Sequence, residues 1–317
     1  MKKMLLTCFI AAVFCSSSFA QNDYGAADKF VEKQGSMDSL NLAQIAKRIT
    51  AGSTDKEQQS RAIFFWISNN IALDPKAIKI NDQRKSLPED VVKLRKGTAL
   101  GFAKLFQEMA SIANIRCLVV DGYIRSGIDE LNSPADEINH SWNVVQLGLS
   151  PDTWHVLDAA KAAGTMDKKM TVFTKKFTTG YFFTDKTLFN LDHYADNDAW
   201  QLGPGPKSIK EFYALPIIGP AAYEYVLKKP TPATGYIKTK SKAKVSFTLP
   251  ISSGATIENV SLIIGDGKKM QKPEPMNFSS NGGAITFSYQ FKTEDTYPVK
   301  ILVDEKMILE YMVEVSE

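Results

Sequence analysis

Apolar residues recur with the spacing of an amphipathic helix in four segments of the N-terminal third of the chain. In the first, Leu42, Ile45 and Ile49 fall on one face, as a period of 3.6 residues requires. In the second, Thr54 followed three residues later by Glu57 is a capping-box pattern, which predicts a helix start. The predicted helices cover residues 39–52, 53–71, 88–97 and 99–112.

The apolar period changes from 3.6 to 2 at about residue 115. Three segments beyond this point alternate between apolar and polar residues and are predicted strands: 116–125, 140–148 and 153–160. Helices followed by antiparallel strands are typical of an α+β fold. Between 165 and 229 the sequence is rich in aromatic residues and shows no long period. We therefore predict no long element in that region.

The stretch KKPTPATG at 228–235 contains two prolines and a glycine and predicts a linker. Most of the chain beyond it alternates like strands, with turn signals at Asp266-Gly267 and Asn281-Gly282. This pattern predicts an all-β, sandwich-like domain. The predicted organisation is a signal peptide at 1–20, an α+β domain at 21–229 and a C-terminal β-sandwich domain at 235–317.

The first 20 residues have the pattern of a secretory signal peptide. Lys2 and Lys3 precede a short apolar run, and the small residues Ser18 and Ala20 predict cleavage after Ala20. The run is shorter than the ~20 apolar residues of a transmembrane helix, and no later segment is apolar enough to cross a membrane. We expect an exported protein, periplasmic or extracellular, with no transmembrane segment.

Charge and cysteine content exclude some functions. The 38 Lys and Arg residues nearly balance 35 Asp and Glu residues, and a net charge of +3 argues against a nucleic-acid partner. Cys8 and Cys15 would leave with the signal peptide. The remaining cysteine, Cys117, lies in an apolar strand pattern and is predicted to be a buried core residue.

Two titratable residues are placed to act together. His140 begins one predicted strand and Asp158 lies near the end of the next, so the two side chains could meet if these strands pair. An imidazole oriented by a carboxylate is the base half of a nucleophilic triad. Its nucleophile would lie at a helix N-terminus, where the dipole stabilises a thiolate, and the helix from Ala99 is the candidate. His155 and His193 are predicted to be structural. Without a His/Cys cluster of zinc-ligand spacing, we predict no metal and no other cofactor.

Three segments in this order resemble the transglutaminase-like superfamily, and especially the branch that includes kyphoscoliosis peptidase. They are RKGTALGFAKLF at 95–106, NHSWNVVQL at 139–147 and WHVLDAA at 154–160. That branch typically has Arg-x-Gly-Val-Cys-x-Gly-Tyr-Ala-x-Leu-Phe, then Asp-His-Ala-Trp-Asn, then Trp-Tyr-x-x-Asp. The resemblance covers about residues 40–226 and implies a papain-like core, in which helices pack on an antiparallel sheet.

The resemblance also implies roles for individual residues. His140 matches the family's catalytic histidine, Asp158 matches its orienting acid, and Ala99 occupies the position of the nucleophilic cysteine. The residues that match the surrounding cleft, and are expected to bind the ligand, are Gly97, Gly101, Trp142 and Asn143. The family's Asp-Ala-Thr-Trp-Gly-Ala-Gly is DAAKAAG here, so a second part of the cleft differs.

A methyl group cannot attack a carbonyl carbon, so the resemblance combined with Ala99 predicts a pseudoenzyme. Its remaining cleft is expected to bind a peptide or protein, for example a cell-envelope polymer. An alternative is an active cysteine peptidase or transglutaminase with a Cys-His-Asp triad, whose nucleophile has been changed to Ala99 in this sequence. A third hypothesis is an adhesion protein that acts through its C-terminal sandwich.

Overall fold

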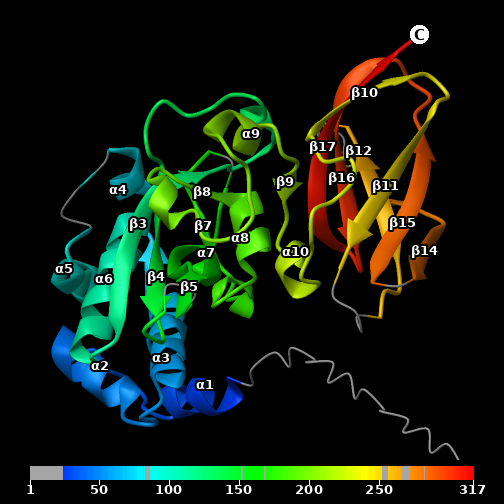
Figure 1. The fold of residues 1–317 in the computed structure, drawn as a ribbon. Coiled ribbons are helices and arrows are strands. Elements are labelled where there is room, and N and C mark those ends of the chain that lie inside the picture. The colour runs from blue at the N-terminus through cyan, green and yellow to red at the C-terminus, as the bar shows by residue number, and fades with distance from the viewer. Residues whose placement is uncertain are drawn as a thin grey trace, which may run out of the picture.

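The computed structural model describes residues 24–80, 82, 86–150, 153–167, 169–251, 256–265, 272–281 and 283–317. The predicted signal peptide at 1–20, the predicted turn at Asp266-Gly267 and Gly282 of the second turn lie outside these residues. Within them the chain forms a helix-and-sheet region followed by a strand-rich region (Figure 1). This mixed architecture confirms the α+β prediction.

The N-terminal region is helical, as predicted. Its helices are α1 (Gly25–Glu32), α2 (Leu42–Thr50), α3 (Lys56–Asn70), α4 (Pro75–Lys79), α5 (Pro88–Leu94) and α6 (Ala99–Ile112). The predicted cap of α3 is wrong. Asp55 caps this helix by accepting a hydrogen bond from the Gln58 amide at 2.9 Å, while the carboxylate of Glu57 accepts one from the Tyr24 hydroxyl. A carboxylate caps at least as well as a threonine hydroxyl, so the helix begins one residue later.

The central sheet has the order β5-β4-β3-β8, and all its pairings are antiparallel. The three predicted strands are present as β3 (Arg116–Ile124), β4 (His140–Gln146) and β5 (Trp154–Leu157). The fourth strand, β8 (His193–Ala195), comes from the region without a predicted long element. Three residues are too few to give a period in the sequence, which is why pattern alone missed it.

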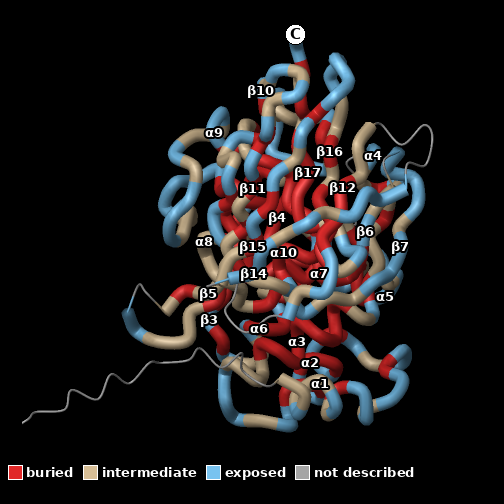
Figure 2. The backbone as a smooth tube through the Cα atoms, turned by 90° about the vertical axis from the view of Figure 1, so that its right-hand side faces the viewer, coloured by how far each residue is buried: buried red, intermediate tan, exposed pale blue. Residues whose placement is uncertain are grey.

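Helix α6 covers one face of this sheet and is fixed to it by Asn143 of β4. The Asn143 side-chain amide donates to the Ala103 carbonyl of α6 at 2.9 Å and to the Leu118 carbonyl of β3 at 3.3 Å. Helix α3 is enclosed still more fully, because residues 60 to 68 are buried without interruption. Figure 2 shows the buried backbone concentrated in α3, α6, α7 and the adjoining strands.

Short elements fill the segment between the central sheet and the predicted linker. They are α7 (Ala159–Ala163), β6 (Gly164–Met166), β7 (Phe173–Lys175), α8 (Lys186–Asp192), α9 (Ile209–Tyr213), β9 (Ile217–Ile218) and α10 (Ala221–Glu224). A two-stranded parallel pair, β1 (Ala72–Leu73) and β2 (Lys96–Gly97), lies just before α6. The predicted strand at 153–160 is too long, because β5 ends at Leu157 and α7 begins directly after Asp158.

The C-terminal region consists of two sheets. Its strands are β10 (Tyr236–Lys240), β11 (Lys244–Pro250), β12 (Val260–Ile264), β13 (Glu274–Pro275), β14 (Phe278–Asn281), β15 (Ala284–Gln290), β16 (Asp295–Val303) and β17 (Lys306–Ser316). One sheet has the order β10-β17-β16-β12-β13 and the other β11-β15-β14. Phe247 of the smaller sheet packs edge-on against Tyr311 of the larger one, with ring centroids 5.6 Å apart. The two sheets enclose a common apolar core, as in a sandwich.

A strand from before the predicted linker joins this C-terminal sheet. Strand β9 pairs with β17 through Ile217 and Ile218, opposite Glu310 and Leu309. At the next residue, an added Cβ on Gly219 would lie 2.2 Å from the Met307 carbonyl oxygen, so this close approach requires glycine. The division at 229 and 235 stays a prediction, and α10 and β9 lie against the C-terminal sheet although they precede it in the chain.

Gly122 provides a test of the central sheet, because it pairs with His140 on one side and Ala195 on the other. A Cβ at Gly122 would lie 2.2 Å from the Tyr194 carbonyl oxygen and 2.6 Å from the Trp142 ring. We expect Gly122→Ala to lower the free energy of unfolding by about 1–3 kcal/mol, as overpacking does, when measured by urea denaturation. Gly127→Ala is the matched control, because nothing lies within 4 Å of its added Cβ. Equal stability of the two variants would contradict this close packing.

Candidate functional site

The structure brings His140 and Asp158 together in the interior. The Nε2 atom of His140 lies 2.5 Å from Oδ2 of Asp158. His140 is 7% exposed and Asp158 only 1%. The contact arises from the sheet register, since Asn143 of β4 pairs with Leu157 of β5, which places the residue after Leu157 beside the start of β4. The ring nitrogen Nδ1 is therefore the one that does not face the carboxylate.

The two oxygens of Asp158 have different partners. Oδ1 accepts a hydrogen bond from the Lys161 amide at 2.9 Å and caps α7, while Oδ2 faces the imidazole of His140. Burial by itself would raise the pKa of this carboxyl, but attraction to His140 and hydrogen bonds with His140 and His193 outweigh burial and hold the pKa well below its usual range. Asp158 is therefore a carboxylate at neutral pH, and it favours the Nε2–H form of His140.

A second histidine, His193, shares the same carboxylate oxygen. Its Nε2 lies 3.1 Å from Oδ2 of Asp158, and its ring stacks on Phe189 with centroids 3.8 Å apart and an interplanar angle of 10°. The Trp142 ring meets it edge-on at 5.2 Å. From the sequence, His193 was predicted to be structural and was not connected with Asp158. His193 lies in a three-residue strand, and the one available signal was a histidine next to an acid within a run of apolar and aromatic residues.

A buried carboxylate, Asp192, lies behind His193. It accepts hydrogen bonds from the hydroxyls of Tyr223 at 3.0 Å and Tyr181 at 3.4 Å, and Lys161 Nζ lies 3.7 Å away. Burial would raise the pKa of Asp192, but the charge of Lys161 and the Tyr223 hydrogen bond oppose it, and the net shift is downward. Buried polar groups thus extend from His140 to Asp192, although Asp192 lies 3.9 Å from the nearest nitrogen of His193 and is not hydrogen-bonded to it.

His140, Asp158 and His193 are also the one set of three or more potential metal ligands in the described residues, with their ligand atoms within 4.8 Å of one another. Two atoms bound to a tetrahedral zinc ion at about 2.0–2.1 Å are roughly 3.3 Å apart. Here Asp158 Oδ2 lies 2.5 Å from one imidazole nitrogen, and both imidazoles point at this oxygen. As folded, the set forms hydrogen bonds and does not fit the geometry of a zinc site.

Ala99 is the first residue of α6 and is partly buried. Helix α6 and β4 run in the same direction, because β3 reverses the chain after α6 and β4 is antiparallel to β3. The contact from Asn143 to Ala103 fixes their relative position. Ala99 precedes Ala103 by about 6 Å of helix and His140 precedes Asn143 by about 10 Å of strand, so both lie toward the same end.

The structure places the other predicted cleft residues in β2, α6 and β4. Gly97 is buried in β2, where its carbonyl accepts a hydrogen bond from the Asp74 amide, and Gly101 donates its amide to Thr98. Trp142 and Asn143 are both buried, one against the histidine rings and the other tethering α6. Their binding role stays a prediction. His155 does not join the group: it is half-buried, and its ring packs on Phe183.

Cys117 is confirmed as a core residue. It is the second residue of β3, and burial raises the pKa of its thiol far above the usual value. A thiol in this environment stays protonated at neutral pH and is a poor nucleophile.

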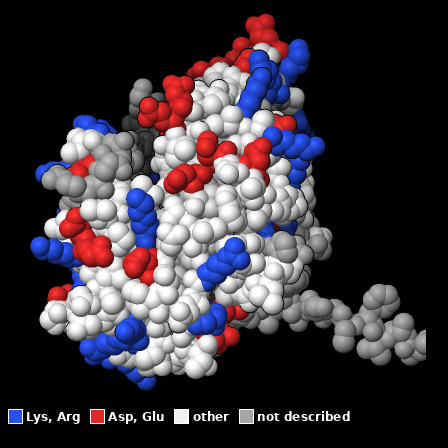
Figure 3. All heavy atoms as spheres, turned by 60° about the vertical axis from the view of Figure 1, so that its left-hand side comes forward, with Lys and Arg blue, Asp and Glu red and all other residues white. Residues whose placement is uncertain are grey.

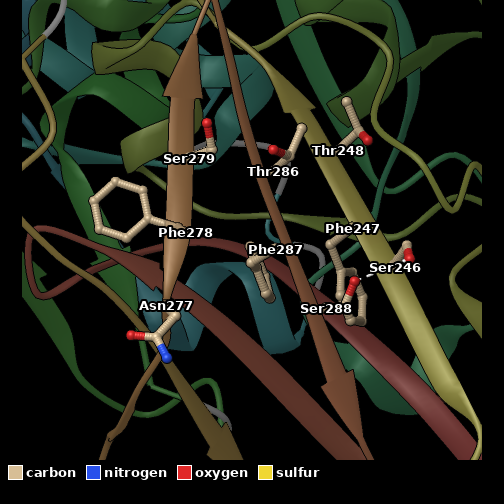
Figure 4. Close-up of a pocket in the computed structure, with 9 residues that line it drawn as sticks. All are labelled: Ser246, Phe247, Thr248, Asn277, Phe278, Ser279, Thr286, Phe287 and Ser288. Atoms are coloured by element: carbon tan, nitrogen blue, oxygen red, sulfur yellow. Dashed lines mark hydrogen bonds between the residues drawn. The ribbon is translucent and has the colours of Figure 1, made fainter.

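Two surface features lie away from the histidines. The outer face of the β11-β15-β14 sheet forms an open hollow of about 460 Å³ (Figure 4). Hydroxyls from three strands line it: Ser246, Thr248, Ser279, Thr286 and Ser288.

Over the face seen in Figure 3, basic and acidic side chains are interspersed and neither sign dominates. Among the described residues, no helix has both the length and the apolar character that crossing a bilayer requires.

The fold and the buried pair define an α+β protein with a histidine–aspartate dyad at the N-terminal end of a central helix. Residues 43–159 match the model of the transglutaminase-like superfamily, so the chain contains a transglutaminase-like segment. The match contains Ala99, His140 and Asp158, whereas His193 lies beyond it.

Among curated proteins, the chain is similar to kyphoscoliosis peptidase. It is 34% identical to the human protein over 160 residues, which are 50% of this chain and 24% of the relative. Identity to the mouse protein is 33% over 156 residues, 49% of this chain and 23% of the relative. The chain therefore spans about a quarter of the length of these relatives. A crystal structure described as a TGase aligns with a TM-score of 0.28 and 15% identity, over 53% of this chain and 38% of that one.

The lowered pKa of Asp158 predicts how the dyad contributes to acid stability. A carboxyl whose pKa is lower in the folded state stabilises the fold fully above its unfolded pKa of about 3.9, and this stabilisation disappears as the pH falls toward the folded pKa. Asp158→Asn preserves a side chain that can cap α7 but removes the charge. We expect it to be less stable than the natural chain at pH 5, with the difference in melting temperature shrinking as the pH falls to 3. A constant difference across that range would contradict the lowered pKa.

Proposed function

We propose that this protein is an exported, catalytically inactive member of the transglutaminase-like superfamily that binds a peptide or protein at the site around His140. The observation that carries the proposal is Ala99 at the first position of α6, at the same end of the fold as a buried histidine–aspartate dyad. The dyad supplies a base and the carboxylate that orients it. A side chain that could attack an acyl group is missing at position 99.

Neighbouring groups do not replace that nucleophile. The Thr98 hydroxyl caps α6 by accepting a hydrogen bond from the Gly101 amide at 3.2 Å, and it lies 3.0 Å from the Ser86 hydroxyl. Drawing it toward His140 would break the cap, at a cost of about 1 kcal/mol, and leave the amide unpaired. Cys117 is fixed within β3 and its thiol is protonated. Both observations support a site without acyl-transfer chemistry.

A site of this kind retains the means to bind. The helix N-terminus offers amide donors that attract carbonyl oxygens, and an imidazole oriented by a carboxylate exchanges hydrogen bonds with a peptide. The predicted signal peptide supports an exported location and therefore an extracellular or envelope ligand. The relatives named as peptidases are about four times longer than the region matched here, so their activity is not transferred to this chain.

The alternative is an active cysteine peptidase or transglutaminase in which the nucleophile has been replaced by alanine in this sequence. The dyad favours it, because the base half of a triad is complete. The gene decides between the two: an alanine codon at position 99 supports the inactive protein, and a cysteine codon supports the enzyme.

We expect the natural chain to show no peptidase, transglutaminase or deamidase turnover, and Ala99→Cys to create an activated thiol. A cysteine at a helix N-terminus beside an imidazole has a pKa of about 3.5–7.5, against about 8.5 for a free thiol. The variant should therefore react with iodoacetamide at pH 6 faster than a model thiol does. The rate of alkylation is measured across pH 4–10, with the natural chain as the control for Cys117.

The second variant, Ala99→Cys with His140→Ala, separates the dyad from the helix. It should lose most of the acceleration, because the imidazole stabilises the thiolate. A thiol that titrates near pH 8.5 in both variants would show that Ala99 does not occupy a nucleophile position. Turnover by the natural chain that survives Cys117→Ser would refute the inactive protein as well.

A further inference from the structure

His193 is placed to control the orientation of the dyad. It shares Oδ2 of Asp158 with His140, and it is fully buried. Its ring is fixed between Phe189, on which it stacks, and Trp142, which meets it edge-on. Such a ring cannot reach a ligand, but it determines where the carboxylate of Asp158 points.

The protonation state of His193 follows from its surroundings. Burial lowers the pKa of its imidazole, and this outweighs the opposing hydrogen bond with Asp158 and the charge of Asp192, so the ring is neutral at neutral pH. A neutral imidazole carries one proton, on either Nδ1 or Nε2. Only the form with the proton on Nε2 can donate to Asp158.

Asp192 decides between these two forms. Its carboxylate lies 3.9 Å from Nδ1 of His193, beyond hydrogen-bond distance. Instead, its Oδ2 accepts hydrogen bonds from Tyr223 and Tyr181 and attracts Lys161. The Nδ1 atom is buried without a hydrogen-bond partner in the described residues. An unpaired lone pair is tolerated more easily there than an unpaired N–H group, so the proton lies on Nε2.

We propose that His193 is a positioning residue, whose Nε2–H donates to Asp158 and aims this carboxylate at His140, and that the hydrogen bond from Tyr223 to Asp192 maintains this tautomer. The inference rests on the proposed function, because it assigns His193 to the site that contains Ala99. The titratable or charged groups that face His193 directly or through Asp192 are Asp158, Asp192, His140, Tyr181, Tyr223, Lys161 and Arg125.

The arrangement also links the site to the C-terminal sheet. Tyr223 lies in α10, directly after β9, which pairs with β17. The next tyrosine, Tyr225, turns to the C-terminal region, where its hydroxyl donates to Asp304 at 2.6 Å. The two tyrosines thus form similar hydrogen bonds to different carboxylates, and of the two Tyr223 is the one bonded to Asp192.

The first measurement uses the natural chain. Nitrogen-15 NMR of its histidines distinguishes the two neutral tautomers and the charged ring. We expect His193 to be neutral, with its proton on Nε2, at pH 7 and above. A proton on Nδ1, or a charged ring at pH 7, would overturn the proposal whether or not position 99 once belonged to a nucleophile.

The second measurement uses the reactivity of the thiol in Ala99→Cys. Adding His193→Phe keeps a ring of similar shape but removes the donor, so Asp158 orients His140 less well. The midpoint of the pH profile of alkylation should rise by about one unit, and the rate at pH 6 falls with it, by up to about tenfold where the thiol pKa lies above 6. His193→Gln has an amide that can replace Nε2–H, and it should restore the rate to within about threefold, because the amide donates as the imidazole does.

Tyr223→Phe and Tyr225→Phe form the matched pair in the same Ala99→Cys background. Tyr223→Phe frees Asp192 to accept from Nδ1 of His193, which moves the proton off Nε2 and lowers the rate at pH 6. Tyr225→Phe should leave the pH profile unchanged. If the His193→Phe variant does not fold, the His193→Gln and Tyr223→Phe variants still test the positioning role of His193.

The outcomes separate this inference from the proposed function. An activated thiol that is indifferent to His193 and Tyr223 in folded variants refutes the positioning role and leaves the vacated nucleophile position intact. A thiol in Ala99→Cys that titrates normally refutes that position, and the tautomer of His193 in the natural chain then decides the positioning role alone.

Discussion

The carboxylate of Asp158 joins helix α7 to strands β4 and β8 of the α+β region. One oxygen caps α7, and the other faces imidazoles from β4 and β8. A charge with 1% exposure is stable only when its oxygens are paired, because the loss of water would otherwise cost several kcal/mol. The two strands and the helix must therefore meet here in a fixed geometry, and the short strand β8 is held in the sheet at this point.

This constraint explains why so much polar chemistry lies in an otherwise apolar interior. His193 is surrounded by Phe189, Trp142 and Tyr181, rings that exclude water and strengthen each remaining hydrogen bond. The next carboxylate, Asp192, would be a second unpaired charge without Tyr223, Tyr181 and Lys161. Each buried acid requires its own donors. The network consequently extends as far as α10, which lies against the C-terminal sheet.

Helix α6 was predicted at both ends, as residues 99–112, from its apolar period alone, and the structure adds the cap that Thr98 provides. The pairing of His140 with Asp158 could also be anticipated, because both lie at strand ends on neighbouring strands. The role of His193 could not, since β8 is too short to leave a pattern and its pairing with β3 joins residues about 70 positions apart. Asp158 was expected near the end of a strand, and nothing in the alternating pattern reveals that it caps a helix.

The presence of the dyad is therefore weak evidence for catalysis. If Asp158 served only to orient a base, a chain with alanine at position 99 would have no physical need for it. However, Asp158 also caps α7 and pairs with two buried imidazoles, and removing one partner of such a buried pair costs about 3–5 kcal/mol. That is a large part of the 5–15 kcal/mol that typically stabilises a domain. The fold thus requires the dyad with or without a nucleophile. The residue at position 99, which has no comparable structural role, is the better guide to chemistry.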